Sequence, residues 1–114
     1  MHMTAQEIGQ TLVVSVDEAR IDAAVAVRFK DRMRELTSAS PSRVVLDLSR
    51  VEFLDSSGLG AVVGSMKQLG RGRKLDLAGL TPTVDKVFRM TRMDSVFQIY
   101  DSADSAVQDV AHAT

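Results

Sequence analysis

The sequence contains no cysteine and no tryptophan, and only two prolines occur among its 114 residues. Without cysteine there is no disulfide framework, no thiol nucleophile and no thiolate metal site. The four phenylalanines and one tyrosine offer few rings on which bases could stack, so binding of single-stranded nucleic acid is not expected. The chain has to rely on a hydrophobic core for its stability.

An excess of one charge and long apolar runs are also missing. The 14 basic and 15 acidic residues give a net charge of −1, which does not steer the protein toward nucleic acid or an anionic membrane. No apolar run approaches the roughly 20 residues that cross a bilayer, and the N-terminus lacks the pattern of a signal peptide. We therefore expect a cytoplasmic protein without direct membrane contact.

Hydrophobic residues make up 45% of the chain, which is enough for one core in a chain of this length. We expect a single domain over residues 4–112 and interpret residues 1–3 as an N-terminal remnant or a disordered segment. No internal repeat or linker is found. Because no long apolar stripe is left over once the core is assigned, we expect a monomer.

The first third of the chain predicts a hairpin followed by a helix. Residues 11–16 are rich in β-branched and apolar side chains, and residues 4–7 precede them as a short partner strand. Asp22 is the expected N-cap of a helix, since aspartate is a preferred residue at this position. From there, apolar residues recur at helical spacing: Val25, Phe29, Met33 and Leu36. The segment Ser38–Ser42 ends this helix.

The middle of the chain predicts a buried strand and a second helix. Val44, Val45 and Leu46 are consecutive apolar residues, as in a strand that is covered on both faces. Residues 57–69 carry one apolar stripe at helical spacing. The opposite side of this helix holds small residues, and we expect it to form a smooth outer surface that lets another backbone approach: Gly60, Ala61, Gly64 and Ser65.

The last third completes an α/β pattern. Residues 74–79 alternate like a strand, Thr81 and Pro82 open a helix, residues 96–100 form a short strand, and Ser102 caps a final helix. The expected fold is α/β, with a mixed sheet of four to five strands and about four helices.

The most informative segment runs from Asp55 to Gly60, with the sequence Asp-Ser-Ser-Gly-Leu-Gly. It follows an apolar strand and opens an amphipathic helix. Hydroxyl groups at a helix start lie beside free backbone N–H groups and the positive end of the helix dipole, so an anionic group attached there is tolerated. The alternative is that Ser56 and Ser57 only cap the helix.

The stretch Val44–Gly60 closely resembles the phosphorylation loop of STAS domains of the anti-sigma factor antagonist family, and the resemblance extends from about Gln10 to Val110. It implies a single STAS domain that works by partner switching. By this resemblance, the unphosphorylated protein is expected to bind an anti-sigma factor, a serine kinase of the histidine-kinase-like ATPase fold, and so to release a sigma factor. The resemblance further implies that phosphorylation of Ser56 abolishes binding and that a PP2C-type phosphatase removes the phosphate. Ser57 matches a position that is serine or threonine in members of this family.

The resemblance and the smooth helix face together predict a partner-binding surface. Its expected members lie at the start of the two helices: Asp22, Asp55, Ser57, Gly58, Leu59, Gly60, Ala61 and Gly64. Asp55 is open between a partner contact and a role in the turn. Asp47 is expected to support the loop as a hydrogen-bond acceptor. One departure from the family pattern is Ala19, because the family often has glycine at this position, three residues before the aspartate.

Other functions fit less well. A serine hydrolase needs a base beside its nucleophile, but the histidines, His2 and His112, lie near the two ends of the chain. We therefore expect no enzyme, no cofactor and no metal, since ATP belongs to the kinase. The remaining alternatives are a STAS regulatory subunit of a membrane transport complex and a signalling scaffold with an output other than a sigma factor.

Basic residues are concentrated between positions 60 and 92. The expectation is that they are the solvated faces of two helices and a turn, and the alternative is a patch that steers toward an acidic partner. The residues are Lys67, Arg71, Arg73, Lys74, Lys86, Arg89 and Arg92.

Overall fold

The computed structural model describes residues 1–39 and 43–113, and the side chains of residues 1–39 and 43–109. The chain opens with a hairpin of β1 (Met3–Ile8) and β2 (Thr11–Val16), which pair antiparallel. Gly9 makes the turn with a φ of +61°, a left-handed conformation that glycine adopts without steric cost. The predicted hairpin is confirmed.

Within the described part of the chain, five strands form one mixed sheet in the order β1-β2-β4-β6-β7. The strands β4 (Arg43–Asp47), β6 (Lys74–Ala78) and β7 (Ile99–Tyr100) run parallel to β2. β4 lies in the middle, and its three apolar residues are fully buried. The prediction of a central strand covered on both faces is therefore confirmed.

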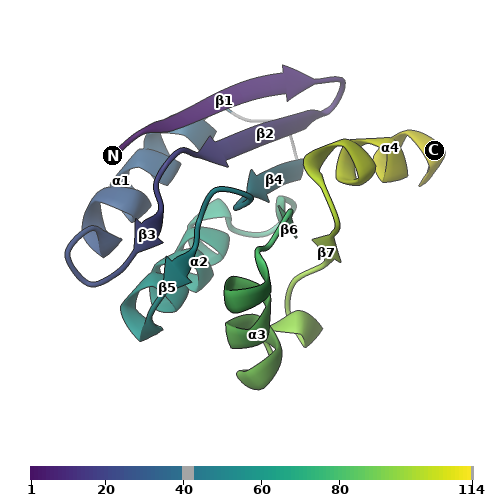
Figure 1. Ribbon diagram of the computed structural model, residues 1–114. Coiled ribbons are helices and arrows are strands. Elements are labelled where there is room, and N and C mark those ends of the chain that lie inside the picture. The colour runs from purple at the N-terminus through teal and green to yellow at the C-terminus, as the bar shows by residue number, and fades with distance from the viewer. Residues whose placement is uncertain (40–42, 114) are drawn as a thin grey trace.

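Helices cover both faces of the sheet. The helices α1 (Ala26–Thr37), α2 (Ser56–Leu69) and α3 (Pro82–Met90) lie on one side, and α4 (Ala103–Ala113) lies alone on the other (Figure 1). Successive residues of a strand point alternately to the two faces of the sheet and contribute to two separate cores. The core below α1–α3 is the larger one, whereas Val13, Val45, Ala78 and Ala106 form a small core under α4.

The last strand differs most from its predicted bounds, whereas the end of the first helix agrees with the prediction. The strand expected over residues 96–100 shrinks to Ile99–Tyr100, because Met93–Ser95 form a short 3-10 helix and Phe97 turns into the core. α1 ends at Thr37, and the rest of the predicted stop, residues 40–42, lies outside the described residues. The Ser102 cap is confirmed, since its Oγ accepts a hydrogen bond from the Ser105 N–H at 3.1 Å.

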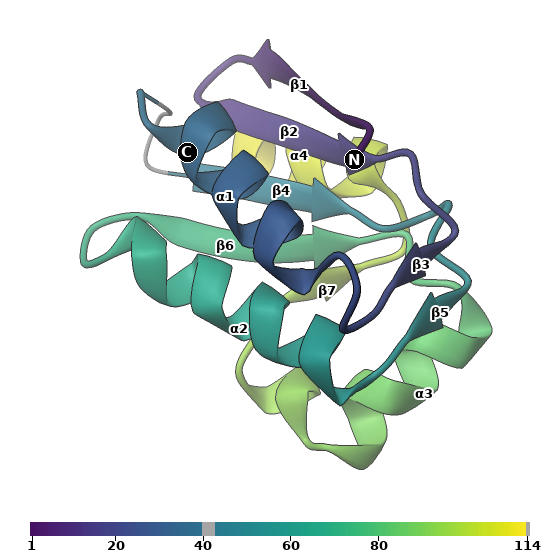
Figure 2. The ribbon, with the colours of Figure 1, turned by 90° about the vertical axis from the view of Figure 1, so that its left-hand side faces the viewer.

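A small parallel ribbon that the sequence did not predict lies directly before Asp22 and Asp55 in the chain. The strands β3 (Arg20–Ile21) and β5 (Phe53–Leu54) pair in parallel, with Ile21 opposite Leu54. Figure 2 shows this ribbon beside the N-terminal ends of α1 and α2. Because the two strands are in register, the residues that follow them, Asp22 and Asp55, are brought to the same end of the molecule.

Candidate functional site

The site is built around the start of α2, where Asp55 is the N-cap. Asp55 has an extended backbone (φ −96°, ψ −175°), and its Oδ1 accepts a hydrogen bond from the Gly58 N–H at 2.9 Å. An aspartate at this position satisfies one of the free N–H groups of a helix start. Because Asp55 supplies the cap, the alternative that Ser56 and Ser57 serve as caps is wrong.

Ser56 and Ser57 are the first two residues of α2, and both are exposed. Across residues 1–39 and 43–113, neither hydroxyl group forms a hydrogen bond with the protein. Their oxygens are therefore available to an external reagent, at the positive end of a 14-residue helix. The predicted setting, a strand followed by a helix start, is confirmed, with the helix beginning one residue earlier than expected.

Asp22 lies beside this loop, as predicted. The backbone N–H of Ala23 donates to Asp55 Oδ2 at 3.3 Å. The Asp55 carboxylate therefore connects the loop that follows β3 with the start of α2. The prediction that Asp22 caps α1 is wrong. Asp22 instead closes a turn before the helix: its carbonyl accepts from the Val25 N–H at 3.1 Å and its carboxylate from the Ala24 N–H at 3.1 Å. α1 then begins at Ala26 without a side-chain cap.

Ala19, which stands where the family often has glycine, contributes through its backbone. Its carbonyl accepts hydrogen bonds from the N–H groups of Glu52 and Phe53 at 2.8 and 3.1 Å. Ala19 itself is exposed, so its methyl group does not obstruct the ribbon that leads to Asp22.

Gly58 fits the close approach of α2 to β3. A Cβ at this position would overlap the carbonyl oxygen of Ile21 and lie 2.9 Å from its carbonyl carbon. Gly58 is buried in this contact. The glycine after the two serines therefore lets the start of α2 lie directly against β3, the strand that Asp22 follows. A larger residue would force the segment around Asp22 away from the start of α2.

The prediction of a smooth outer face on α2 is wrong for most of its residues. Ala61 and Ser65 are each only 2% exposed, because this side of α2 packs against α1. Gly64 is covered by the stem of Lys30, whose Cε would be 3.0 Å from a Cβ at this glycine. Small side chains allow the two helix backbones to approach closely, which is a packing role. Gly60 alone of this set is exposed with open space at its Cβ.

Leu59 and Asp47 also have defined positions. Leu59 is half-buried and packs against the main core. Asp47, at the end of β4, accepts a hydrogen bond from the Ser49 N–H at 3.0 Å. The carboxylate thus holds the start of the connection between β4 and β5. This connection leads to the segment Asp55–Gly60 at the start of α2, the Ser56 loop.

A buried ion pair under α4 was missed by the sequence analysis. Asp76 is fully buried, and its Oδ2 lies 2.8 Å from Nη2 of Arg43. Arg43 also donates to the Ala106 carbonyl at 2.8 Å and lies over the ring of Tyr100. The alternation along β6 placed Asp76 on a polar face, and no sequence signal shows that α4 covers that face.

The basic residues between positions 60 and 92 are partly engaged within the protein. Arg73 donates to the carbonyls of Leu69 and Thr37. Arg89 pairs with Asp85 at 2.8 Å and with Asp94 at 3.6 Å. Arg73 is half-buried and differs in this from the expected solvated cation. The internal pairing of Arg89 favours the expectation of a cation on a helix face over a patch that steers a partner.

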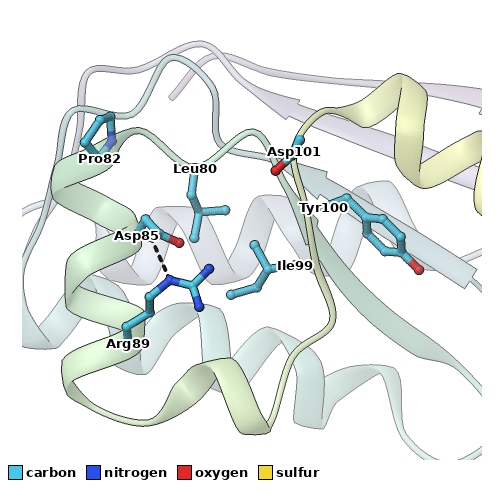
Figure 3. Close-up of a pocket in the computed structure, with 7 residues that line it drawn as sticks. All are labelled: Leu80, Pro82, Asp85, Arg89, Ile99, Tyr100 and Asp101. Atoms are coloured by element: carbon cyan, nitrogen blue, oxygen red, sulfur yellow. Dashed lines mark hydrogen bonds and ion pairs between the residues drawn. The ribbon is translucent and has the colours of Figure 1, made fainter.

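Arg89 also lines a cavity of about 330 Å³ between α3 and β7 (Figure 3). Its guanidinium points toward Leu80 and Ile99, while its Nε bonds the Asp85 carboxylate. The lining residues come from α3, β7 and their flanking loops. None of them belongs to the Ser56 loop, and the charged pair in the wall is already satisfied.

The described residues offer neither a metal-binding cluster nor a membrane-spanning helix. No group of three or more histidine, aspartate or glutamate side chains in this part of the chain is arranged to hold a metal ion. No helix among the same residues is long and apolar enough to cross a membrane.

Comparison with known proteins identifies the class. The model of the STAS domain family matches residues 2–106, and the chain therefore belongs to the STAS domain family. A similar protein, the anti-sigma-B factor antagonist of Listeria monocytogenes, is 31% identical over 80 residues, which cover 69% of this chain and 70% of the relative.

Two further relatives agree with this family. The anti-sigma-F factor antagonist RsfB of Mycobacterium tuberculosis is 24% identical over 90 residues, covering 79% of this chain and 74% of RsfB. The crystal structure of an anti-sigma factor antagonist from Mycobacterium paratuberculosis superposes with a TM-score of 0.85 and 27% identity, over 96% of this chain and 93% of that one. The α/β fold and the resemblance to the anti-sigma factor antagonist family are thus confirmed.

Proposed function

We propose that this protein is an anti-sigma factor antagonist that works by partner switching. Its unphosphorylated form binds an anti-sigma factor serine kinase and thereby releases a sigma factor, and phosphorylation of Ser56 abolishes this binding. A PP2C-type phosphatase restores the binding form. The protein acts in the cytoplasm as a monomer and is itself no enzyme. It takes no cofactor or metal, because ATP is bound by the kinase.

The observation that carries the proposal is the exposed Ser56 hydroxyl at the first position of a long helix, directly after the capping Asp55. The cap leaves the serine oxygen free of internal hydrogen bonds. A kinase can therefore reach it without unfolding any element. The free N–H groups and the dipole of the helix start stabilise the added phosphate in the unbound protein.

Release of the partner follows from local charge. A phosphoserine adds about −1.5 to −2 charges next to Asp55, whose carboxylate is bonded to the loop that carries Asp22. A partner packed over this loop has to accommodate the extra bulk and the extra charge at once. We therefore expect dissociation with little change of fold in the antagonist.

The partner surface is smaller than the sequence alone suggests. Its proposed members are the exposed or half-buried residues around the loop: Asp22, Asp55, Ser57, Leu59 and Gly60. Gly58 contributes indirectly, because its lack of a side chain allows the start of α2 to pack against β3. Ala61 and Gly64 are left out, because α1 and the stem of Lys30 cover them.

The proposal is tested with the candidate anti-sigma serine kinases of the source organism. Wild type, Ser56→Ala and the matched control Ser57→Ala are incubated with ATP, and intact mass and peptide mapping locate the phosphate. We expect one phosphate on Ser56 in wild type and Ser57→Ala and none in Ser56→Ala. Phosphorylation should weaken the complex about tenfold or more, because like charges at an interface are strongly unfavourable.

Two results would contradict the proposal. A phosphate on Ser57 in place of Ser56 would move the acceptor. Tight binding to a kinase without any modification would favour a constitutive scaffold or a subunit of a transport complex.

A further inference from the structure

An exposed arginine and an exposed aromatic residue are stacked beside the Ser56 loop. Arg20 and Phe53 face each other in the β3–β5 ribbon, and the guanidinium carbon of Arg20 lies 4.1 Å from the centroid of the Phe53 ring. The next residue in each strand is buried in the core, namely Ile21 and Leu54. Since side chains alternate along a strand, the pair is presented on the outer side of the ribbon.

Arg20 is held in place but keeps binding capacity. Its Nε lies 3.4 Å from Asp22 Oδ2, and its side chain is 60% exposed. Within the part of the chain that the structure describes, its two terminal amino groups have no hydrogen-bond partner. These groups form a planar fork that matches a carboxylate in geometry and charge.

Phe53 is unusual among the exposed apolar residues. Of the five large hydrophobic side chains exposed in the described residues, it is the only aromatic one; the others are Ile8, Val27, Met90 and Val96. It is 37% exposed although it lies only two residues before the Asp55 cap. Aromatic side chains, phenylalanine included, and arginine are enriched in protein interfaces relative to the rest of the surface.

We propose that the Arg20–Phe53 pair is an anchor for the protein partner, and that the partner places a carboxylate on the terminal amino groups of Arg20 and an apolar side chain on the Phe53 ring. This inference rests on the proposed function and deepens it. The charge of Arg20 is the part that selects an acidic partner segment. Stacking on the ring and the contact with Asp22 fix the guanidinium before binding, so less side-chain freedom is lost on association.

The test compares two variants with two matched controls. Arg20→Met removes the charge but keeps an apolar stem, and Phe53→Ala removes the ring. Arg50→Met is the control for charge, because Arg50 is similarly exposed and paired, with its Nε 3.5 Å from Asp17 Oδ1. Met90→Ala is the control for an exposed apolar residue, since Met90 is 74% exposed on α3. Calorimetric titration with the unphosphorylated proteins gives Kd for the anti-sigma kinase.

We expect Arg20→Met and Phe53→Ala each to raise Kd about tenfold, while both controls stay within about twofold of wild type. Arg20→Met should also weaken the salt dependence of Kd, because a charge pair across the interface is lost. Thermal unfolding of each variant shows whether it is folded. If Phe53→Ala is not, Phe53→Leu, which keeps an apolar side chain of similar reach, takes its place.

The outcomes separate this inference from the function on which it rests. If wild type binds the kinase and both variants bind equally well, the anchor is wrong and the proposed function stands. Tighter binding of Arg20→Met would also overturn the anchor, since it would mean a basic partner surface. If wild type binds none of the kinases, the proposed function fails and the anchor fails with it.

Discussion

Replacing Gly58 with alanine should separate the two loops that form the site. The new Cβ would overlap the Ile21 carbonyl oxygen, lie 2.9 Å from the carbonyl carbon and approach Cγ2 of Ile21 to 3.2 Å. The first two of these are backbone atoms, which cannot rotate out of the way. Either β3 or the first turn of α2 has to shift, and the hydrogen bond between Ala23 and Asp55 lies directly between them.

The size of the effect follows from two opposing terms. Overpacking of this kind costs about 1–3 kcal/mol, or more where the obstructing atoms are rigid. Alanine offsets up to about 1 kcal/mol of this through its higher helix propensity. We expect the free energy of unfolding to fall by about 2 kcal/mol, which lowers Tm by about 8 °C in a domain of this size.

The assay is urea and thermal denaturation followed by circular dichroism, with Gly60→Ala as the matched control. Gly60 lies two residues further along the same helix, and nothing lies within 4 Å of its potential Cβ. Gly60→Ala should therefore be neutral or stabilise the protein by up to about 1 kcal/mol. Equal stability of the two alanine variants would refute the argument that Gly58 is needed for the contact with β3.

Two further predictions concern the face under α4. Replacing Asp76 alone with leucine leaves Arg43 without its buried counter-ion and should lower the free energy of unfolding by about 3–5 kcal/mol, whereas the Arg43→Met/Asp76→Leu double variant should lose less. Urea denaturation measures the free energy of unfolding of both variants. A loss in the double variant equal to the sum of the two single losses would contradict this prediction. Burial, followed by the hydrogen bond to Asp109, raises the pKa of Tyr100. The stability contributed by its neutral phenol is therefore complete below about pH 10 and is lost as pH rises through the folded pKa. Tyr100 is the single tyrosine, so phenolate absorbance reports it directly, and a midpoint equal to that of the unfolded chain would contradict the prediction.

The local pattern of the sequence was sufficient for the main elements. The hairpin, the central strand and the helix after Asp55 were predicted because each depends on neighbouring residues: β-branched and apolar runs, consecutive apolar residues, or an apolar stripe at helical spacing. The exposed position of Ser56 at a helix start follows from the same local signals. This part of the site lies within one continuous segment of the chain.

Contacts between distant segments could not be read in this way. The sequence placed Ala61, Gly64 and Ser65 on an open face because nothing in the stripe pattern says which side of α2 receives α1. The same limit applies to Asp76, whose burial depends on where α4 docks. Asp22 was misassigned as a cap because a turn that precedes the helix satisfies its carboxylate first.

The sequence by itself therefore determined the order of the elements, the α/β class and the placement of the two serines at a helix start. Only the tertiary structure decided that β3 pairs with β5, which brings Asp22 to Asp55 and stacks Arg20 on Phe53. The physical reason is that pairing between two strands of two residues each, which lie far apart in the sequence, leaves no local periodicity from which it could be predicted. It depends on how α1 and α2 pack on the sheet, and that packing sets which residues are left exposed around Ser56.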